Sequence, residues 1–280
     1  SNWKNISDKY FGGTIGSVAI APSDENVIYV GEGENTMRGN VSEGLGGIWR
    51  SDDGGRTWKN IGLKEGRHII RIVIHPTDPN TVWVAVMGHL FGPHPDRGVF
   101  KTTDGGKTWR KTLYVNEQTG ASDLVMEPGN PSVFYAGTWR LIRTPYSLES
   151  GGEGSGLWKS TDGGETWKEI TANPGMPKGM IGKINVDVSR AQRNLVWAMI
   201  ESANGGLFKS VDGGANWSPI NHGLEKLMEA GFHVTAVIVD PASPSLVYVG
   251  TAGGGVYKTA DAGANWVSLN DGLESLDVRV

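Results

Sequence analysis

Short apolar runs, separated by clusters of Gly, Pro, Asn, Asp and Ser, recur along the whole chain. Residues 17–20, 27–30, 47–50 and 58–61 form the first set of four such runs, rich in β-branched and aromatic side chains. Short runs of this composition, bounded by turn-forming residues, are typical of β-strands. Four further sets of four follow the same plan, so the pattern predicts an all-β chain made of repeated four-stranded units.

Four strands in every period of about 50 residues are typical of the blades of a β-propeller. We therefore predict one propeller domain over residues 1–280, with five complete antiparallel blades at approximately 14–62, 67–114, 121–171, 180–221 and 233–270. The first run of each unit is the most continuously apolar, as expected of an innermost strand that is buried on both faces. One short helix is expected between blades, at residues 224–230.

One turn recurs between the third and fourth strands of every unit. The pattern Ser/Thr-x-Asp-x-Gly-x-Thr/Asn-Trp occupies residues 51–58, 102–109, 160–167, 210–217 and 259–266. An Asp in such a turn accepts hydrogen bonds from nearby backbone N–H groups, Gly supplies positive φ, and Trp covers the hairpin. An enzyme needs one active site and not five copies. We therefore assign structural roles, in place of catalysis or metal binding, to Asp53, Asp104, Asp162, Asp212 and Asp261.

The two ends of the chain carry fragments of the same pattern. Residues 3–6 read as a fourth strand without a third, and residues 276–280 read as a first strand without a successor. Propellers commonly close by pairing strands from opposite termini, which removes exposed sheet edges. Two interpretations stay open: a partial sixth blade completes the ring, or the chain is part of a longer propeller. Closure by an oligomer or by a second propeller domain is a further expectation.

Composition narrows the classes of function. The formal net charge is −4, without a basic block, so nucleic acid is not an expected partner. No run approaches 18 apolar residues, so membrane insertion is not expected. The chain has no cysteine, which excludes disulfides and thiolate chemistry. No signal peptide is visible at its start.

The candidate binding residues lie on the loops between the second and third strands of a unit. These loops are long in the first three units and minimal in the last two. Their aromatic, basic and histidine side chains suit a sugar or peptide chain. The ligand-binding candidates are Arg38, His89, Phe91, Arg97, Trp139, Arg140, Arg143 and Tyr146. The alternative interpretation is that Trp139 and Phe91 only fix the long loops.

Each enzymatic alternative needs a specific set of residues, and these loops supply each set only in part. Glycoside hydrolysis needs two carboxylates facing one cleft, for which the candidates are Glu32, Glu34, Asp96 and Asp123. A sialidase would need an arginine cluster, and Arg38, Arg140 and Arg143 lack the accompanying motif. A metal site from His89, His94 and Asp96 has loose spacing. We expect no metal and no cofactor.

The recurring turn is similar to the Asp-box, or bacterial neuraminidase repeat, of sialidases, sortilin-type receptors, photosystem assembly factors and xyloglucan-cleaving glycoside hydrolases. Residues 67–69, 75–80, 87–93 and 97–106 more narrowly resemble bacterial sortilin-type or glycosyl-hydrolase-like propeller proteins. The resemblance implies a bacterial protein that is secreted, periplasmic or on the cell surface. It also implies that Asp-boxes lie away from any active site, and that a xyloglucanase cleft would need a second propeller.

These observations together favour a non-enzymatic propeller that recognises an extended peptide or glycan on the face of the long loops. The alternative is a xyloglucanase-like glycoside hydrolase, or a truncated or engineered fragment of one.

Overall fold

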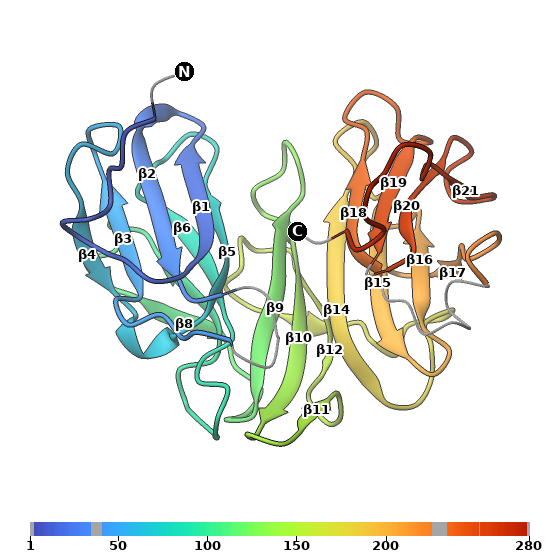
Figure 1. Ribbon diagram of the computed structural model, residues 1–280, viewed down its shortest axis with the longest axis horizontal. Helices are drawn as coiled ribbons and strands as arrows, with labels where there is room; N and C mark the ends of the chain where they lie inside the picture. Colours follow the sequence, from blue (N-terminus) through green and yellow to red (C-terminus); the bar gives the residue numbers. More distant parts are fainter. Residues whose placement is uncertain (1–2, 35–40, 226–233, 252, 279–280) are drawn as a thin grey trace.

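The structure, a computed structural model, describes residues 3–34, 41–225, 234–251 and 253–278. The described residues form five antiparallel sheets that follow one another in chain order from one end of the molecule to the other (Figure 1). We call them blades one to five, and the predicted all-β propeller of four-stranded blades is confirmed. No helix among the described residues is long and apolar enough to cross a membrane.

Strands within each blade pair in sequence order, from the first strand to the fourth. Blade one contains β1 (Ile15–Ala21), β2 (Asp24–Glu32), β3 (Ile48–Ser51) and β4 (Lys59–Gly62), and the 3₁₀ turn η1 (Lys64–Gly66) leads to blade two. Blade two contains β5 (Ile69–Ile74), β6 (Val82–Val86), β7 (Gly98–Thr102) and β8 (Arg110–Leu113). Blade four contains β14 (Ile181–Val188), β15 (Val196–Ser202), β16 (Gly206–Ser210) and β17 (Ser218–Pro219). Blade five contains β18 (Val234–Val239), β19 (Val247–Thr251), β20 (Gly255–Thr259) and β21 (Val267–Ser268).

Blade three departs from the predicted four strands. It contains β9 (Thr119–Met126), β10 (Phe134–Arg143), β12 (Gly156–Ser160) and β13 (Lys168–Glu169), and an additional strand, β11 (Leu148–Ser150), folds back onto the end of β10. Because β10 is longer than the other second strands, it projects beyond the sheet and gives β11 a partner. The predicted helix at residues 224–230 lies, after Glu225, outside the described residues.

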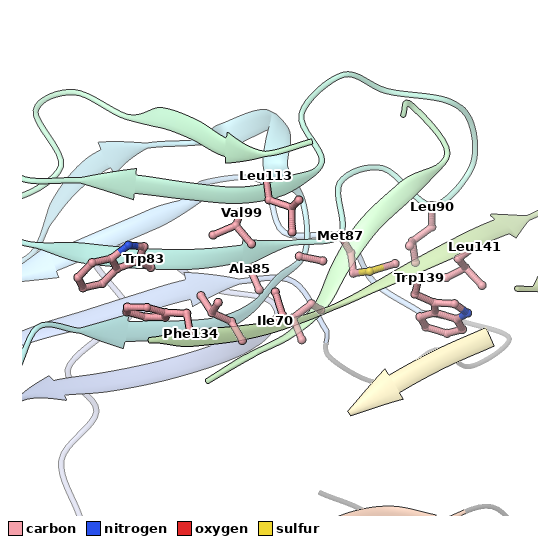
Figure 2. Packing of buried hydrophobic residues seen from close by; sticks show 13 residues of the cluster. Ile70, Trp83, Ala85, Met87, Leu90, Val99, Leu113, Phe134, Trp139 and Leu141 are labelled. Atoms are coloured by element: carbon pink, nitrogen blue, oxygen red, sulfur yellow. The ribbon is translucent and has the colours of Figure 1, made fainter. Parts of the chain in front are cut away.

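The core consists of layers between successive blades, and one apolar cluster joins each neighbouring pair. Figure 2 shows the layer between blades two and three, where Trp83 and Phe134 pack with ring centroids 4.6 Å apart. Both faces of an inner sheet are therefore buried, which explains the nearly continuous apolar runs of the first and second strands.

The recurring turn is fixed by hydrogen bonds within eight residues. The Asp162 Oδ1 atom accepts from the Thr166 N–H group at 3.0 Å, and Asp162 Oδ2 accepts from the Thr166 hydroxyl at 2.5 Å. The Ser160 hydroxyl donates to Asp162 at 2.8 Å and accepts from the Gly164 N–H group. The other four turns repeat this set of bonds, with Asn in place of Thr in the last two.

The expected terminal strands take a different form. Residues 3–6 form no strand, because no third strand lies beside them, but the Trp58 Nε1–H group donates to the Ile6 carbonyl at 3.1 Å. The tryptophan of blade two makes the same bond to Ile61, on the fourth strand of the preceding blade. At the other end, Leu276 accepts from the Gly253 N–H group. Both described end segments thus occupy positions next to a blade without forming a ladder.

Candidate functional site

The long loops of the first three blades adjoin one another at the end of the molecule that carries β11 (Figure 1). The Leu90 N–H group of the blade-two loop lies 3.4 Å from Glu43 Oε1 of the blade-one loop. The Arg143 N–H group, at the end of β10, donates to the Leu90 carbonyl at 3.1 Å. Blades one, two and three therefore present one continuous surface, which we call the long-loop face.

Two aromatic side chains project from adjoining parts of this face. Phe91 is 54% exposed and Tyr146 is 97% exposed. Tyr146 lies at the tip of the hairpin between β10 and β11, where the Thr144 hydroxyl accepts from the N–H groups of Tyr146 and Ser147. These local bonds fix the turn, so the ring of Tyr146 stands in solvent on a defined backbone.

Two arginines flank this hairpin. Arg140 donates to the Gly151 carbonyl at 2.9 Å and to Gln118 Oε1 at 3.2 Å, so it holds the connection after β11 in place. Its Nη2 atom lies 3.5 Å from the exposed Glu149 carboxylate. Arg143 Nη1 lies 3.5 Å from the Ser147 carbonyl. Half-buried arginines beside an exposed aromatic ring provide donors with restricted geometry.

Two of the predicted ligand-binding side chains are buried, which corrects that assignment. Trp139 is 5% exposed and packs in the cluster with Met87 and Leu90 (Figure 2). Its Nε1–H group donates to the Ser150 hydroxyl at 2.9 Å. Alternate residues of a strand share a face, and Trp139 lies on the same side of β10 as the buried Leu141. This alternation was readable from the sequence.

Arg97 has a similar structural role. It is 1% exposed, and its guanidinium donates to the carbonyl oxygens of His89, Gly92 and Gln118. Burial lowers the pKa of Arg97 to about 10, which leaves it charged at neutral pH. The side chain therefore fixes the blade-two loop from inside and offers no exposed donor to a ligand.

Two of the four candidate carboxylates are also engaged in structural bonds. Glu32 is buried and accepts from the N–H groups of Leu45 and Gly46 and, at 2.7 Å, from Trp49 Nε1. This arrangement corrects its assignment as a catalytic candidate, since both oxygens close the blade-one loop.

Asp123 is buried near the inner strands and joins three blades. It accepts from Arg71 of blade two at 3.0 Å and from the Val186 N–H group of blade four at 3.0 Å. Donors from two other blades occupy both oxygens of this carboxylate, so it serves to hold the three blades together. The role of Asp123 is thus structural as well.

The two remaining predicted carboxylates lie in or near the long-loop face. The Asp96 side chain is 41% exposed, and Glu34 is half-buried where the blade-one loop begins. Arg38 lies outside the described residues. The structure therefore leaves Asp96 and Glu34 as the carboxylates of the predicted set with an accessible position.

Glu65, His89 and His94 form a polar cluster that the sequence prediction captured only in part. Their potential ligand atoms all lie within 4.8 Å of one another. The centroids of the two imidazole rings are 4.2 Å apart, and the ring planes are tilted by 30°. His89 Nε2 lies 3.2 Å from Glu65 Oε2 and 3.2 Å from Arg67 Nε, and Arg67 pairs with Glu65 at 3.0 Å. Hydrogen bonds from His89 and Arg67 lower the pKa of Glu65.

The Arg67 guanidinium contacts both the carboxylate and the imidazole, and it disfavours a second cation at the same place because like charges repel. The absence of a metal remains a prediction. Glu65 and Arg67 escaped the sequence prediction because they precede β5, on the connection between blades, and not in a loop between second and third strands.

Comparisons with known proteins agree with this architecture. Residues 46–178 match the family model described as Sortilin, neurotensin receptor 3. Xyloglucanase Xgh74A of Acetivibrio thermocellus is 24% identical over 216 residues, which cover 72% of this chain and 23% of the relative. Vacuolar protein sorting/targeting protein 10 of Sordaria macrospora is 28% identical over 149 residues, or 53% of this chain and 9% of the relative.

Among solved structures, an ancestral GH74 enzyme superposes with a TM-score of 0.72 at 19% identity, over 95% of this chain and 32% of the other. The chain thus spans about a quarter of the length of the xyloglucanase and a third of the solved enzyme. The recurring turn, the stacked blades and these matches lead to one conclusion: the chain is an Asp-box-like β-propeller, similar to the sortilin family in residues 46–178 and to glycoside hydrolase propellers in fold.

Proposed function

We propose that the long-loop face binds a polysaccharide chain, and that the protein acts as a propeller of the glycoside-hydrolase type. The observation that carries this proposal is the pair of exposed rings, Phe91 and Tyr146, on adjoining loops. The names of several relatives, which are xyloglucanases, make xyloglucan the first ligand to test. Location outside the cytoplasm belongs to the same proposal, because such polysaccharides are met there.

Aromatic rings bind sugars through their apolar C–H faces, and polar groups beside them select the hydroxyls. Phe91 and Tyr146 would supply the first interaction. Arg140, Arg143 and Glu149 would supply the second, since their side chains surround the hairpin that carries Tyr146. The same surface could accept an extended peptide, but the relatives support a glycan.

Hydrolysis is the second candidate function, favoured by the xyloglucanase relatives. It requires an acid and a second carboxylate on opposite sides of one sugar bond. Because Glu32 and Asp123 are engaged in structural hydrogen bonds, Asp96 and Glu34 are the proposed candidates. Since a xyloglucanase-like cleft would need a second propeller, the chain would supply one wall of it.

Binding is tested by titrating tamarind-type xyloglucan into the chain and into a Phe91→Ala, Tyr146→Ala double variant. We expect the double variant to bind at least about tenfold more weakly, because stacked rings carry much of the affinity at such sites. Trp3→Ala is the matched control, since Trp3 is as exposed as Tyr146 and belongs to none of the loops of the long-loop face.

Equal affinity of the double variant and the control would contradict the proposed surface. Release of reducing ends from xyloglucan by the chain, abolished by Asp96→Asn with binding retained, would favour hydrolysis over binding alone.

A further inference from the structure

The additional strand β11 has one edge that no other strand covers. It lies at the end of the long second strand of blade three (Figure 1). Of the described strands it pairs only with β10, where Leu141 lies opposite Ser150 and Arg143 lies opposite Leu148. We call the uncovered side of residues 148–150 the β11 edge.

Two backbone hydrogen bonds fix the pairing pattern between β10 and β11. The Gly151 N–H group donates to the Arg140 carbonyl at 2.9 Å, and the Thr144 N–H group donates to the Ser147 carbonyl at 2.9 Å. Hydrogen-bonded pairs alternate with non-hydrogen-bonded pairs along an antiparallel ladder. The pair midway between these two bonds is therefore hydrogen-bonded as well.

Leu148 and Ser150 consequently present backbone groups at the β11 edge. The midway pair consists of Ile142 and Glu149, so the N–H and C=O groups of Glu149 face β10. The N–H and C=O groups of Leu148 and Ser150 point to the other side. Among the described residues, these outward groups have no hydrogen-bond partner.

The fourth strands of the blades are also sheet edges, but most of them are protected. β4, β8 and β13 each begin with Lys or Arg, and β17 contains Pro219. Charged side chains and proline at an edge discourage pairing with another chain. β11 has neither a basic residue nor proline, and its one charged side chain, Glu149, lies 3.5 Å from Arg140.

A groove of about 470 Å³ begins where the β11 edge ends. Residues 152–155 form one wall, and Thr171 with residues 179–181 forms the other. Gly152, the next outward residue after Ser150, donates to the Ile181 carbonyl at 3.0 Å, so a segment of blade four already pairs at this position. Met180 on the second wall is 68% exposed and offers an apolar contact. The groove has room for a side chain of a strand that pairs with the β11 edge.

Three exposed carboxylates surround the β11 edge and this groove. Glu149 belongs to β11, Glu153 lines the groove, and Glu201 of blade four accepts from the Ser150 hydroxyl at 2.7 Å. Among the described residues, only Glu149 of these three forms an ion pair. Complementary charge selects between partners, so the acidic surroundings favour a partner with a basic side chain.

We propose that the β11 edge binds an extended peptide, which adds a strand to blade three beside β11. The peptide backbone exchanges hydrogen bonds with Leu148 and Ser150, because an added strand matches donors and acceptors that recur every second residue. An apolar side chain of the peptide enters the groove beside Met180, and a basic side chain faces Glu153. This site uses main-chain groups and is separate from the exposed aromatic rings assigned to glycan binding.

The probe is a fluorescein-labelled peptide of alternating Thr and Val with one central Lys, and fluorescence anisotropy measures its binding. Two N-methylated forms of the probe separate strand addition from side-chain contact, because each lacks the backbone donors of one alternate set of residues. We expect one form to bind at least about tenfold more weakly and the other to bind like the unmodified probe. A probe with central Glu should also bind more weakly, since the site is acidic.

Leu148→Pro and Leu148→Thr locate the site on the protein. Proline removes one outward donor and no hydrogen bond of the sheet, and proline is tolerated at such edge positions, whereas threonine keeps the donor. We expect weaker probe binding by Leu148→Pro and nearly unchanged binding by Leu148→Thr. Amide hydrogen exchange of residues 147–152, read by mass spectrometry, should slow when the unmodified probe is bound. The comparison of the N-methylated probes does not depend on the folding of any variant.

Four outcomes would overturn the proposal. The unmodified probe could fail to bind at millimolar concentration. Both N-methylated probes could bind as tightly as the unmodified one, which would show that no strand is added. Hydrogen exchange could slow elsewhere and not at residues 147–152, which would place the peptide on another surface. Sedimentation could show dimers of the free chain that Leu148→Pro dissociates, which would assign the β11 edge to a second copy.

Discussion

The ammonium group of Lys159 lies 2.7 Å from the carbonyl oxygen of Gly213, and this single hydrogen bond connects the third strand of blade three to the Asp-box turn of blade four. The turn is thus more than a local hairpin. Asp212 accepts hydrogen bonds from the backbone of its own turn and so fixes the turn's conformation. In this conformation the Gly213 carbonyl points toward blade three.

Lys159→Met should destabilise the fold. The change keeps the aliphatic stem but removes a charged donor, and it leaves the buried Gly213 carbonyl with one donor fewer, at a cost of about 1–3 kcal/mol. Lys178→Met is the control, because Lys178 is exposed. Urea denaturation measures both, and equal stability of the two variants would contradict the junction role.

The Asp-box turns should make stability fall in acid. A side-chain hydrogen bond from Thr57 and a backbone bond lower the pKa of Asp53 to about 2, and the corresponding bonds from Asn216 lower the pKa of Asp212 to about 2. A depressed carboxyl pKa contributes stability above the unfolded value near 4, and this is lost as pH falls toward 2.

The denaturation midpoint should therefore drop between about pH 4 and pH 2, and Asp212→Asn should reduce that drop while lowering the midpoint at pH 7. A midpoint that does not vary over this interval would show that the turns are not linked to proton binding.

His68 should add a second pH dependence at higher pH. The side chain is fully buried, and desolvation lowers its pKa below the usual 6.5. The folded state thus prefers neutral imidazole, so its contribution is present above about pH 6.5 and is lost as pH falls through the lower, folded-state value. His222→Gln, at an exposed site, should leave this dependence intact.

The melting temperature, followed by heat denaturation between pH 7 and pH 5, measures this contribution of His68 to stability. A His68→Gln variant that keeps the same slope as the original chain would assign the effect to other groups.

Trp139→Ala should damage the fold before it affects any ligand. Removal of a buried tryptophan from a packed layer costs about 3–5 kcal/mol. Tyr146→Ala, at a side chain that is almost fully exposed, should leave the melting temperature unchanged. Melting curves of the two variants distinguish packing from surface display, and a stable Trp139→Ala variant would restore Trp139 as a candidate ligand contact.

The blades were predictable because their signals are local. The bonds of Asp162 reach Thr166 four residues later, and strand alternation is visible in any short window. The additional strand β11 was missed because it depends on the length of β10 and not on its own composition. Neither apolar periodicity nor a turn motif marks residues 148–150.

The site was less predictable because its roles depend on distant partners. Glu32 is a structural carboxylate because Trp49 lies 2.7 Å away, and Asp123 because Arg71 and Val186 approach it from two other blades. Residue type and loop position alone could not separate these from Asp96. By contrast, Phe91 and Tyr146 lie in loops whose backbone is fixed by neighbours, and both are exposed, so their binding role stays a prediction.

The restriction of the Asp-box bonds to a span of at most four residues also bears on how the protein is made. A hairpin with such close contacts can form as soon as it leaves the ribosome, since little loop-closure entropy opposes it. Synthesis of about 50 further residues, one repeat, then completes the neighbouring blade that covers the exposed face of the first. Because synthesis begins at the N-terminus, we expect the blades to fold one after another, each packing against the blade that precedes it.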